Sequence, residues 1–112
     1  MVELVVRLAA IPGQAHGVVQ ALRSVMRQSL ANAGCARAHI AVDIDVASTF
    51  WYCEEWLDAA ALEAQMRSDR FSQLLALLET ATDPPLLEFR VVVETRGLEY
   101  VAAARGGTAR EA

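Results

Sequence analysis

The hydrophobic positions of this chain follow two periods, and each change of period marks the boundary of a predicted element. Residues 2–8 have period two, which predicts a strand. Pro12-Gly13 breaks this strand, and residues 14–33 then follow the i, i+3, i+4 spacing of an amphipathic helix. Gly34 comes directly after the helix, where a left-handed cap residue is expected.

Period two returns after the glycine, and the rest of the chain divides into strands and short helices. An aromatic, β-prone segment follows the second strand after a short connection, so the two are predicted to form a hairpin. Asp58 is a suitable N-cap for a short helix, and Asp83-Pro84-Pro85 ends the helix that follows it. The predicted elements are strands at 35–45, 49–56 and 86–94, a helix at 58–66 and a helix that begins at Ser68 or Asp69.

The order strand, helix, strand, strand, helix, strand is the split βαβ arrangement of a ferredoxin-like α+β fold. This arrangement predicts a four-stranded antiparallel sheet with the helices on one face. The opposite face still carries apolar residues such as Val5, Trp51 and Cys53, which would form an exposed patch in a monomer. We therefore expect a homodimer that packs through this face. Residues 1–94 are predicted to form the domain and residues 95–112 a C-terminal tail.

Composition and charge narrow the class of partner. The chain has 112 residues, of which 54% are hydrophobic, and this surplus suits a dimer of single-domain subunits. The net charge is −4 and the basic residues are scattered arginines, which disfavours nucleic acid as a partner. No apolar run is long enough to cross a bilayer and no signal peptide follows Met1, so we expect a cytoplasmic protein without a membrane partner.

The two cysteines, Cys35 and Cys53, are too few for a disulfide framework and lack the spacing of a metal site. They are expected to be small buried hydrophobic residues. An interchain bridge or a reactive thiol is the alternative.

Several stretches give the chain a family resemblance. They are Pro12-Gly13 before the first helix, Gly34-Cys35 after it, and the block EWLDAAALEAQMRSDRF from Glu55 to Phe71. Together they resemble the antibiotic biosynthesis monooxygenase-like family over about residues 2–94. The resemblance implies a dimeric α+β barrel in which two sheets face each other. It also implies a pocket in each protomer between the sheet and the helices.

Characterised members of that family include oxygenases that convert phenolic polycyclic substrates to quinones without metal or flavin, and relatives that degrade haem. The chain has Gln65 where the family commonly has a His, so the obvious imidazole base is missing. Leu75 stands where the haem-degrading relatives have a His, which disfavours haem degradation. The resemblance therefore implies a monooxygenase without a cofactor or metal that acts on a small aromatic or quinone-like substrate. The alternative is a non-catalytic dimeric ligand-binding or stress-associated module.

The candidate catalytic residues are Tyr52, Trp56, Arg90 and His39. Tyr52 could hold a substrate phenol, and the Nε1–H group of Trp56 could donate to an oxyanion. Arg90 could neutralise a substrate anion, and His39 could act as a general base near neutral pH. Core packing is the alternative for the two aromatic residues. For Arg90 the alternative is a cross-strand ion pair, and for His39 it is a solvated or interface position.

The candidate substrate-binding residues are Gln65, Phe71 and Trp51. Gln65 is expected to approach the sheet face of Tyr52 from the short helix and to orient a carbonyl or a water molecule. A surface-facing side chain is the alternative for Gln65. Trp51 lies on the opposite face, where a place in the dimer interface is the favoured alternative. Glu54 and Glu55 are adjacent in a strand and therefore point to opposite faces, which argues against a mechanism with paired carboxylates.

Overall fold

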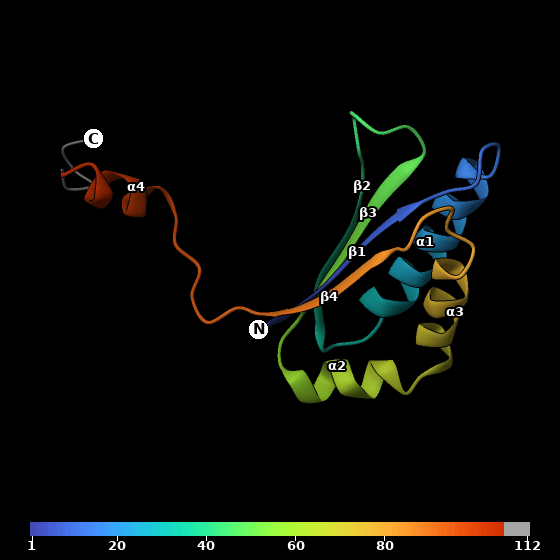
Figure 1. Cartoon of the computed structure of the whole chain (residues 1–112). Coiled ribbons are helices and arrows are strands. Elements are labelled where there is room, and N and C mark those ends of the chain that lie inside the picture. Colours follow the sequence, from blue (N-terminus) through green and yellow to red (C-terminus); the bar gives the residue numbers. More distant parts are fainter. Residues whose placement is uncertain (107–112) are drawn as a thin grey trace.

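The computed structural model describes residues 1–106, which form a four-stranded antiparallel sheet with three helices on one face (Figure 1). The strand order is β2-β3-β1-β4, and the predicted ferredoxin-like α+β fold is confirmed. Residues 107–112 of the predicted tail lie outside the described part of the chain. The elements are β1 (Val2–Ala9), α1 (Ala15–Leu30), β2 (Cys35–Val42), β3 (Thr49–Trp56), α2 (Ala59–Met66), α3 (Asp69–Leu78), β4 (Leu86–Val91) and α4 (Leu98–Ala104).

The hydrophobic core lies between the sheet and the helices and has two parts. The larger part is formed by the inward side chains of β1 and β3 together with the apolar stripes of α1 and α3. The smaller part lies beneath α2 and consists of Val2, Cys35, Trp56 and Leu62. Because alternate strand residues share a face, the inward position of Tyr52 places Trp56 on the same side of the sheet.

Two strands are shorter than the sequence pattern predicts. β4 ends at Val91 because its partner β1 begins at Val2, which pairs with Val91. Beyond that pair only the Met1 carbonyl remains, and it accepts a hydrogen bond from the Val92 amide at 2.9 Å. β2 ends at Val42 because the chain turns at Asp43. The Asp43 carboxylate accepts hydrogen bonds from the backbone amides of Asp45 and Val46 at 3.0 and 3.1 Å.

The prediction of a left-handed cap at Gly34 is wrong. α1 ends at Leu30, and positive φ occurs instead at Gly13, with a φ of 85° in the turn before α1. Gly34 is needed for close packing, since a Cβ atom there would lie 2.7 Å from the Cβ atom of Ala61. The glycine thus allows α2 to approach the start of β2.

The sheet face opposite the helices is covered by no element of residues 1–106, and we call it the bare face. It carries an apolar strip of Val5, Trp51 and Cys53 bordered by charged side chains. Val5 is buried by its neighbours, whereas Trp51 and Cys53 are half-buried. Within the same residues, no helix combines the length and the apolar character needed to cross a membrane.

Candidate functional site

A buried carboxylate lies where β3 passes beneath the helices. β3 points Tyr52, Glu54 and Trp56 to the same side, and all three side chains are buried. The Glu54 carboxylate accepts a hydrogen bond from the Tyr52 hydroxyl and another from Trp56 Nε1 at 2.9 Å. The inward face of β3 therefore supplies one acceptor and two donors.

The helices complete the site from above. Ser29 continues the buried stripe of α1, and its Oγ donates to Glu54 Oε2 at 2.6 Å. Gln65 of α2 is also buried, and its Nε2 donates to Ser29 Oγ at 3.0 Å. Arg70 of α3 donates through Nε and Nη2 to Gln65 Oε1 at 3.2 and 3.0 Å. We call Ser29, Tyr52, Glu54, Trp56 and Gln65 the Glu54 cluster.

The chemistry of the donors fixes the direction of these hydrogen bonds. An Arg side chain can only donate, so Gln65 presents its carbonyl to Arg70 and its amide to Ser29. The Ser29 hydroxyl, which accepts from that amide, is then free to donate to Glu54. Trp56 can only donate as well. Every polar group in contact with the Glu54 carboxylate is thus a donor, which is the arrangement of an anion-binding site.

The connection between α2 and α3 positions Gln65 and Arg70. Asp58 caps α2, with its carboxylate accepting from the Ala61 amide at 2.8 Å, which confirms the predicted cap. Ser68 caps α3, and its hydroxyl donates to the backbone carbonyl of Gln65 at 2.5 Å. The Ser68 contact holds the end of α2 close to the first turn of α3, where Arg70 lies.

Burial changes the proton affinity of two groups at the site. Burial, followed by the nearby Glu54 carboxylate, raises the pKa of Tyr52 well above its usual range, so its hydroxyl remains a donor at neutral pH. Burial likewise raises the pKa of Cys35 to about 11. Cys35 is therefore a neutral buried thiol, as predicted, whereas Cys53 is half-buried on the bare face.

The structure brings together three of the predicted site residues: Tyr52, Trp56 and Gln65. Both aromatic side chains have an exposed fraction of 0%, so no water-sized space touches them. The expected pocket beside them is filled by the side chains of the Glu54 cluster. Gln65 approaches from α2 as predicted, but it contacts Ser29 and Arg70.

Arg90 and His39 do not reach this site. His39 pairs in register with Cys53 and Arg90 with Glu3, so both lie on the bare face. The Arg90 side chain is exposed and forms an ion pair with Glu88 at 3.0 Å. Side chains alternate between the two faces along a strand. His39 and Arg90 each stand next to inward-facing residues of their strand, so their side chains point to the bare face.

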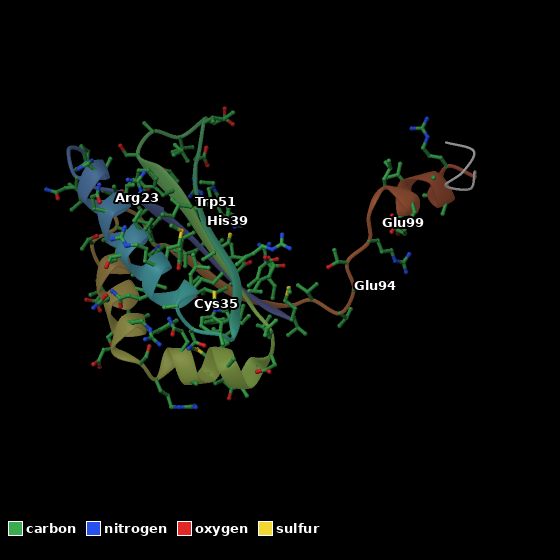
Figure 2. All side chains as sticks on the ribbon, turned by 180° about the vertical axis from the view of Figure 1, so that it is seen from behind. Arg23, Cys35, His39, Trp51, Glu94 and Glu99 are labelled. Atoms are coloured by element: carbon green, nitrogen blue, oxygen red, sulfur yellow. The ribbon has the colours of Figure 1, made fainter. Side chains whose placement is uncertain are left out.

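Trp51 and Phe71 also lie apart from the cluster. Trp51 is on the bare face, where its Nε1 donates to Asp43 Oδ2 at 3.4 Å and the Arg7 guanidinium lies 5.8 Å from its ring centre (Figure 2). Phe71 of α3 is buried in the larger core. The geometry thus places Trp51 at the expected dimer face and Phe71 in the core.

Sequence reasoning missed Glu54, Ser29 and Arg70 as members of the site. The alternation of β3 contained a signal for Glu54, because it places a carboxylate on the same face as Tyr52 and Trp56. Ser29 lies four residues after Val25 on the apolar stripe of α1, which marks it as a buried polar residue. Arg70 had no such signal, because its role depends on where α3 begins relative to α2.

Among residues 1–106 no group of three or more His, Cys, Asp or Glu side chains is arranged to hold a metal ion.

Comparison with known proteins gives a family and a fold. The family model "Antibiotic biosynthesis monooxygenase" matches residues 1–77. A Deinococcus radiodurans protein solved under that family name has a TM-score of 0.77 at 19% identity, covering 88% of this chain and 98% of its own. A Pseudomonas aeruginosa protein has a TM-score of 0.70 at 25% identity, with coverages of 83% and 94%. A Mycobacterium tuberculosis protein has a TM-score of 0.75 at 15% identity, with coverages of 86% and 98%. A search of curated proteins finds no significant match.

Proposed function

Because the chain belongs to the antibiotic biosynthesis monooxygenase family, we propose that it is a cofactor-independent monooxygenase of small aromatic or quinone-like substrates, with its site at the Glu54 cluster. The observation that carries this proposal is the convergence of three donors, from Ser29, Tyr52 and Trp56, on one buried carboxylate. A substrate that reduces oxygen directly requires a base for its proton and donors for the resulting anion. The Glu54 cluster contains both.

The proposed reaction converts an activated methylene group of the substrate into a carbonyl. Glu54 takes a proton from the substrate, and the electrons left behind reduce O₂. One oxygen atom forms the new C=O bond, and the other leaves as water with the two hydrogens of the methylene group. When Glu54 accepts the proton it loses its charge, so the Tyr52 and Trp56 donors can turn to the substrate oxygen, where the negative charge now lies.

A substrate would enter past Gln65. Tyr52, Trp56 and Ser29 are fully buried, whereas Arg70, which holds the Gln65 carbonyl, is half-buried at the surface. Displacing the Gln65 side chain frees Ser29 Oγ and opens a path from the surface to Glu54. In this proposal Gln65 serves as the movable cover of the site, and Arg70 holds it in the closed position.

A non-catalytic ligand-binding or stress-associated module is the second candidate, and a specific observation favours it. Among residues 1–106 every buried side-chain nitrogen and oxygen has a hydrogen-bond partner. A network that is fully satisfied without a ligand stabilises the closed state. In that case the Glu54 cluster is a structural replacement for a site that binds substrate in other proteins of the family.

We further propose that the protein is a cytoplasmic homodimer in which the bare faces of two copies pack together. The apolar strip of Val5, Trp51 and Cys53 supports this assembly, since each copy would cover the strip of the other. The domain is proposed to span residues 1–94, with residues 95–112 as its tail. The partners are then a second copy and a small aromatic molecule.

Oxygen consumption with a panel of anthrones, which carry an activated methylene group, tests the proposed activity. We expect the protein to consume O₂ and to form a quinone, one molecule of each per substrate. Glu54→Gln removes the proton acceptor and should lower the rate by about 10²-fold or more. Glu55→Gln is the matched control, because Glu55 is the next residue on the opposite face and should leave the rate unchanged.

Two outcomes would contradict the proposal. If Glu54→Gln retains the rate, the base is another group. If the unmodified protein consumes no oxygen with any member of the panel but binds an aromatic probe, the non-catalytic module is the better conclusion.

A further inference from the structure

We propose that the C-terminal arm, residues 92–106, docks on the tip of the β2–β3 hairpin, residues 42–46, of a second copy of this chain. The inference rests on the proposed homodimer and specifies a contact that the packing of the bare faces does not itself require. The hairpin tip of one copy is the binding site, and the arm of the other copy is the segment that binds to it.

The arm exposes apolar side chains that its own domain does not cover. Val93 is 93% exposed and Leu98 is 77% exposed, and Tyr100 and Val101 are exposed as well. Leu98 and Val101 lie three positions apart in α4 and therefore share one face of the helix. A segment with this pattern is typical of a surface that is covered by a partner.

The arm has a defined local structure even though it leaves the domain. The Arg96 guanidinium lies 4.7 Å from the ring centre of Tyr100, and Arg96 pairs with Glu94 at 2.8 Å. The Glu99 carboxylate accepts a hydrogen bond from the Gly97 amide at 2.9 Å and so orders the start of α4. These contacts therefore hold the exposed apolar side chains of α4 together on one ordered surface.

Both views place the arm on the side where the partner is expected. The helices α1 and α3 lie on one side of the sheet and the arm extends from the other (Figure 1). Seen from behind, the arm with Glu94 and Glu99 again lies opposite the helices (Figure 2). A second copy on the bare face would thus occupy the space next to the arm.

The hairpin tip is an ordered loop with uncovered apolar side chains. Ile44 is 94% exposed, and Val42 and Val46 are exposed beside it. Asp43 holds this loop through the amides of Asp45 and Val46 and accepts from Trp51. Because the backbone is fixed in this way, the three apolar side chains are held at the surface.

A two-fold axis that runs across the strands would bring the arm and the tip together. The arm leaves β4 at the end of the sheet opposite the hairpin. Val91 pairs with Val2, and Val2 pairs with Trp56 at the end of β3 that lies away from the hairpin. In a pair whose axis runs across the strands, this end of one sheet faces the hairpin end of the other. The extended residues 92–97 can span up to roughly 20 Å. Packed sheets lie only about 10 Å apart, so the arm is long enough to reach.

Each surface carries one charge that is not paired within its own copy. At the tip, Asp43 pairs with Arg7 at 3.8 Å, whereas Asp45 forms no ion pair among residues 1–106. Arg105 follows α4 and likewise forms none within that part of the chain. Docking α4 on the tip would bring this cation towards the acidic loop. The favoured occupant of the tip is therefore the partner's arm.

Site-specific crosslinking between two differently tagged, co-expressed chains tests the contact. One chain carries Ile44→Cys and the other Leu98→Cys, both in a Cys53→Ser background that removes the half-buried thiol of the bare face. We expect mild oxidation to give a disulfide-linked pair containing both tags. Leu75→Cys, on the exposed side of α3, replaces Ile44→Cys in the control pair and should give no such product.

Sedimentation equilibrium provides a second measurement. Leu98→Asp with Val101→Asp should raise the dimer dissociation constant roughly tenfold or more, because two apolar contacts are lost from each arm. Ala103→Asp, about 140° around the helix from Leu98, is the control and should leave it unchanged.

The possible failures can be distinguished. A protein that remains dimeric but forms no crosslink, and whose dissociation constant the arm substitutions do not change, would overturn the arm contact alone. A monomer at all concentrations would overturn the arm contact together with the homodimer.

Discussion

At the scale of single residues, the position of Glu54 is the most informative feature of the chain. A buried carboxylate without hydrogen bonds would be strongly destabilising, and here three donors offset that cost. Adjacent to it in sequence, Glu55 pairs with Arg37 on the opposite face at 3.2 Å. One step along a strand therefore separates a candidate catalytic group from an ordinary partly exposed ion pair.

Cys35 gives a prediction about pH at this scale. Its pKa is raised from 9.0 to about 11 by burial and then by the Glu54 charge, so the folded state favours the neutral thiol. The stability that this provides is fully present below pH 9 and is lost as the pH rises through about 11. In Cys35→Ala, the melting temperature should therefore fall less between pH 9 and pH 11 than in the unmodified protein. Equal falls in the two proteins would show that Cys35 does not contribute.

At the scale of elements, the packing of α2 against β2 depends on Gly34. A Cβ atom in Gly34→Ala would lie 2.7 Å from that of Ala61 and would push α2 outward, so we expect a loss of about 1–3 kcal/mol in the free energy of unfolding. Gly17→Ala is the opposite case. Gly17 lies inside α1 with nothing within 4 Å of an added Cβ, and alanine should stabilise by about 0.5–1 kcal/mol.

Urea denaturation of the two alanine variants measures both changes. If Gly34→Ala proves as stable as the unmodified protein, α2 must be able to shift without cost, and the close approach is not what requires the glycine. If Gly17→Ala does not stabilise, the propensity argument fails at that position.

The ends of the elements depend on neighbours rather than on local sequence. Residues 92–94 continue the alternating pattern of β4, yet the strand ends at Val91 because β1 has no further residues with which to pair. The apolar period alone therefore predicted too long a strand.

At the scale of the whole molecule, the bare face and the C-terminal arm both lack a covering element among residues 1–106. Trp51→Glu replaces the largest apolar side chain of the bare face with a carboxylate. It should convert the expected dimer into a monomer, because the strip loses apolar area and a charged group would have to be desolvated at the interface. Sedimentation velocity measures the change. Leu75→Glu, on the exposed side of α3, is the control and should remain dimeric.

A dimer that persists in Trp51→Glu would place the interface elsewhere. The proposed arm contact would then lose its basis as well, since it depends on the bare faces packing together.

The amino-acid sequence was enough to predict the order and type of the elements, the α+β class, and the shared face of Tyr52 and Trp56. These features follow from the periods of strands and helices, which depend only on local backbone geometry. It also placed Gln65 on the helix that covers this face. The residues of the resemblance, from Glu55 to Phe71, identified the family that the comparison confirmed.

The polar contacts of the site depend on how the helices pack on the sheet. The hydrogen bonds from Ser29 to Glu54 and from Gln65 to Ser29 join residues 25 and 36 positions apart, and no local pattern specifies such a pairing. For Arg90 and His39, alternation along the strand already separates them from their inward neighbours, and the packing of the helices decides which face is the covered one. Periodicity says which residues share a face, but the packing of helices on the sheet fixes which of them lie within hydrogen-bond distance.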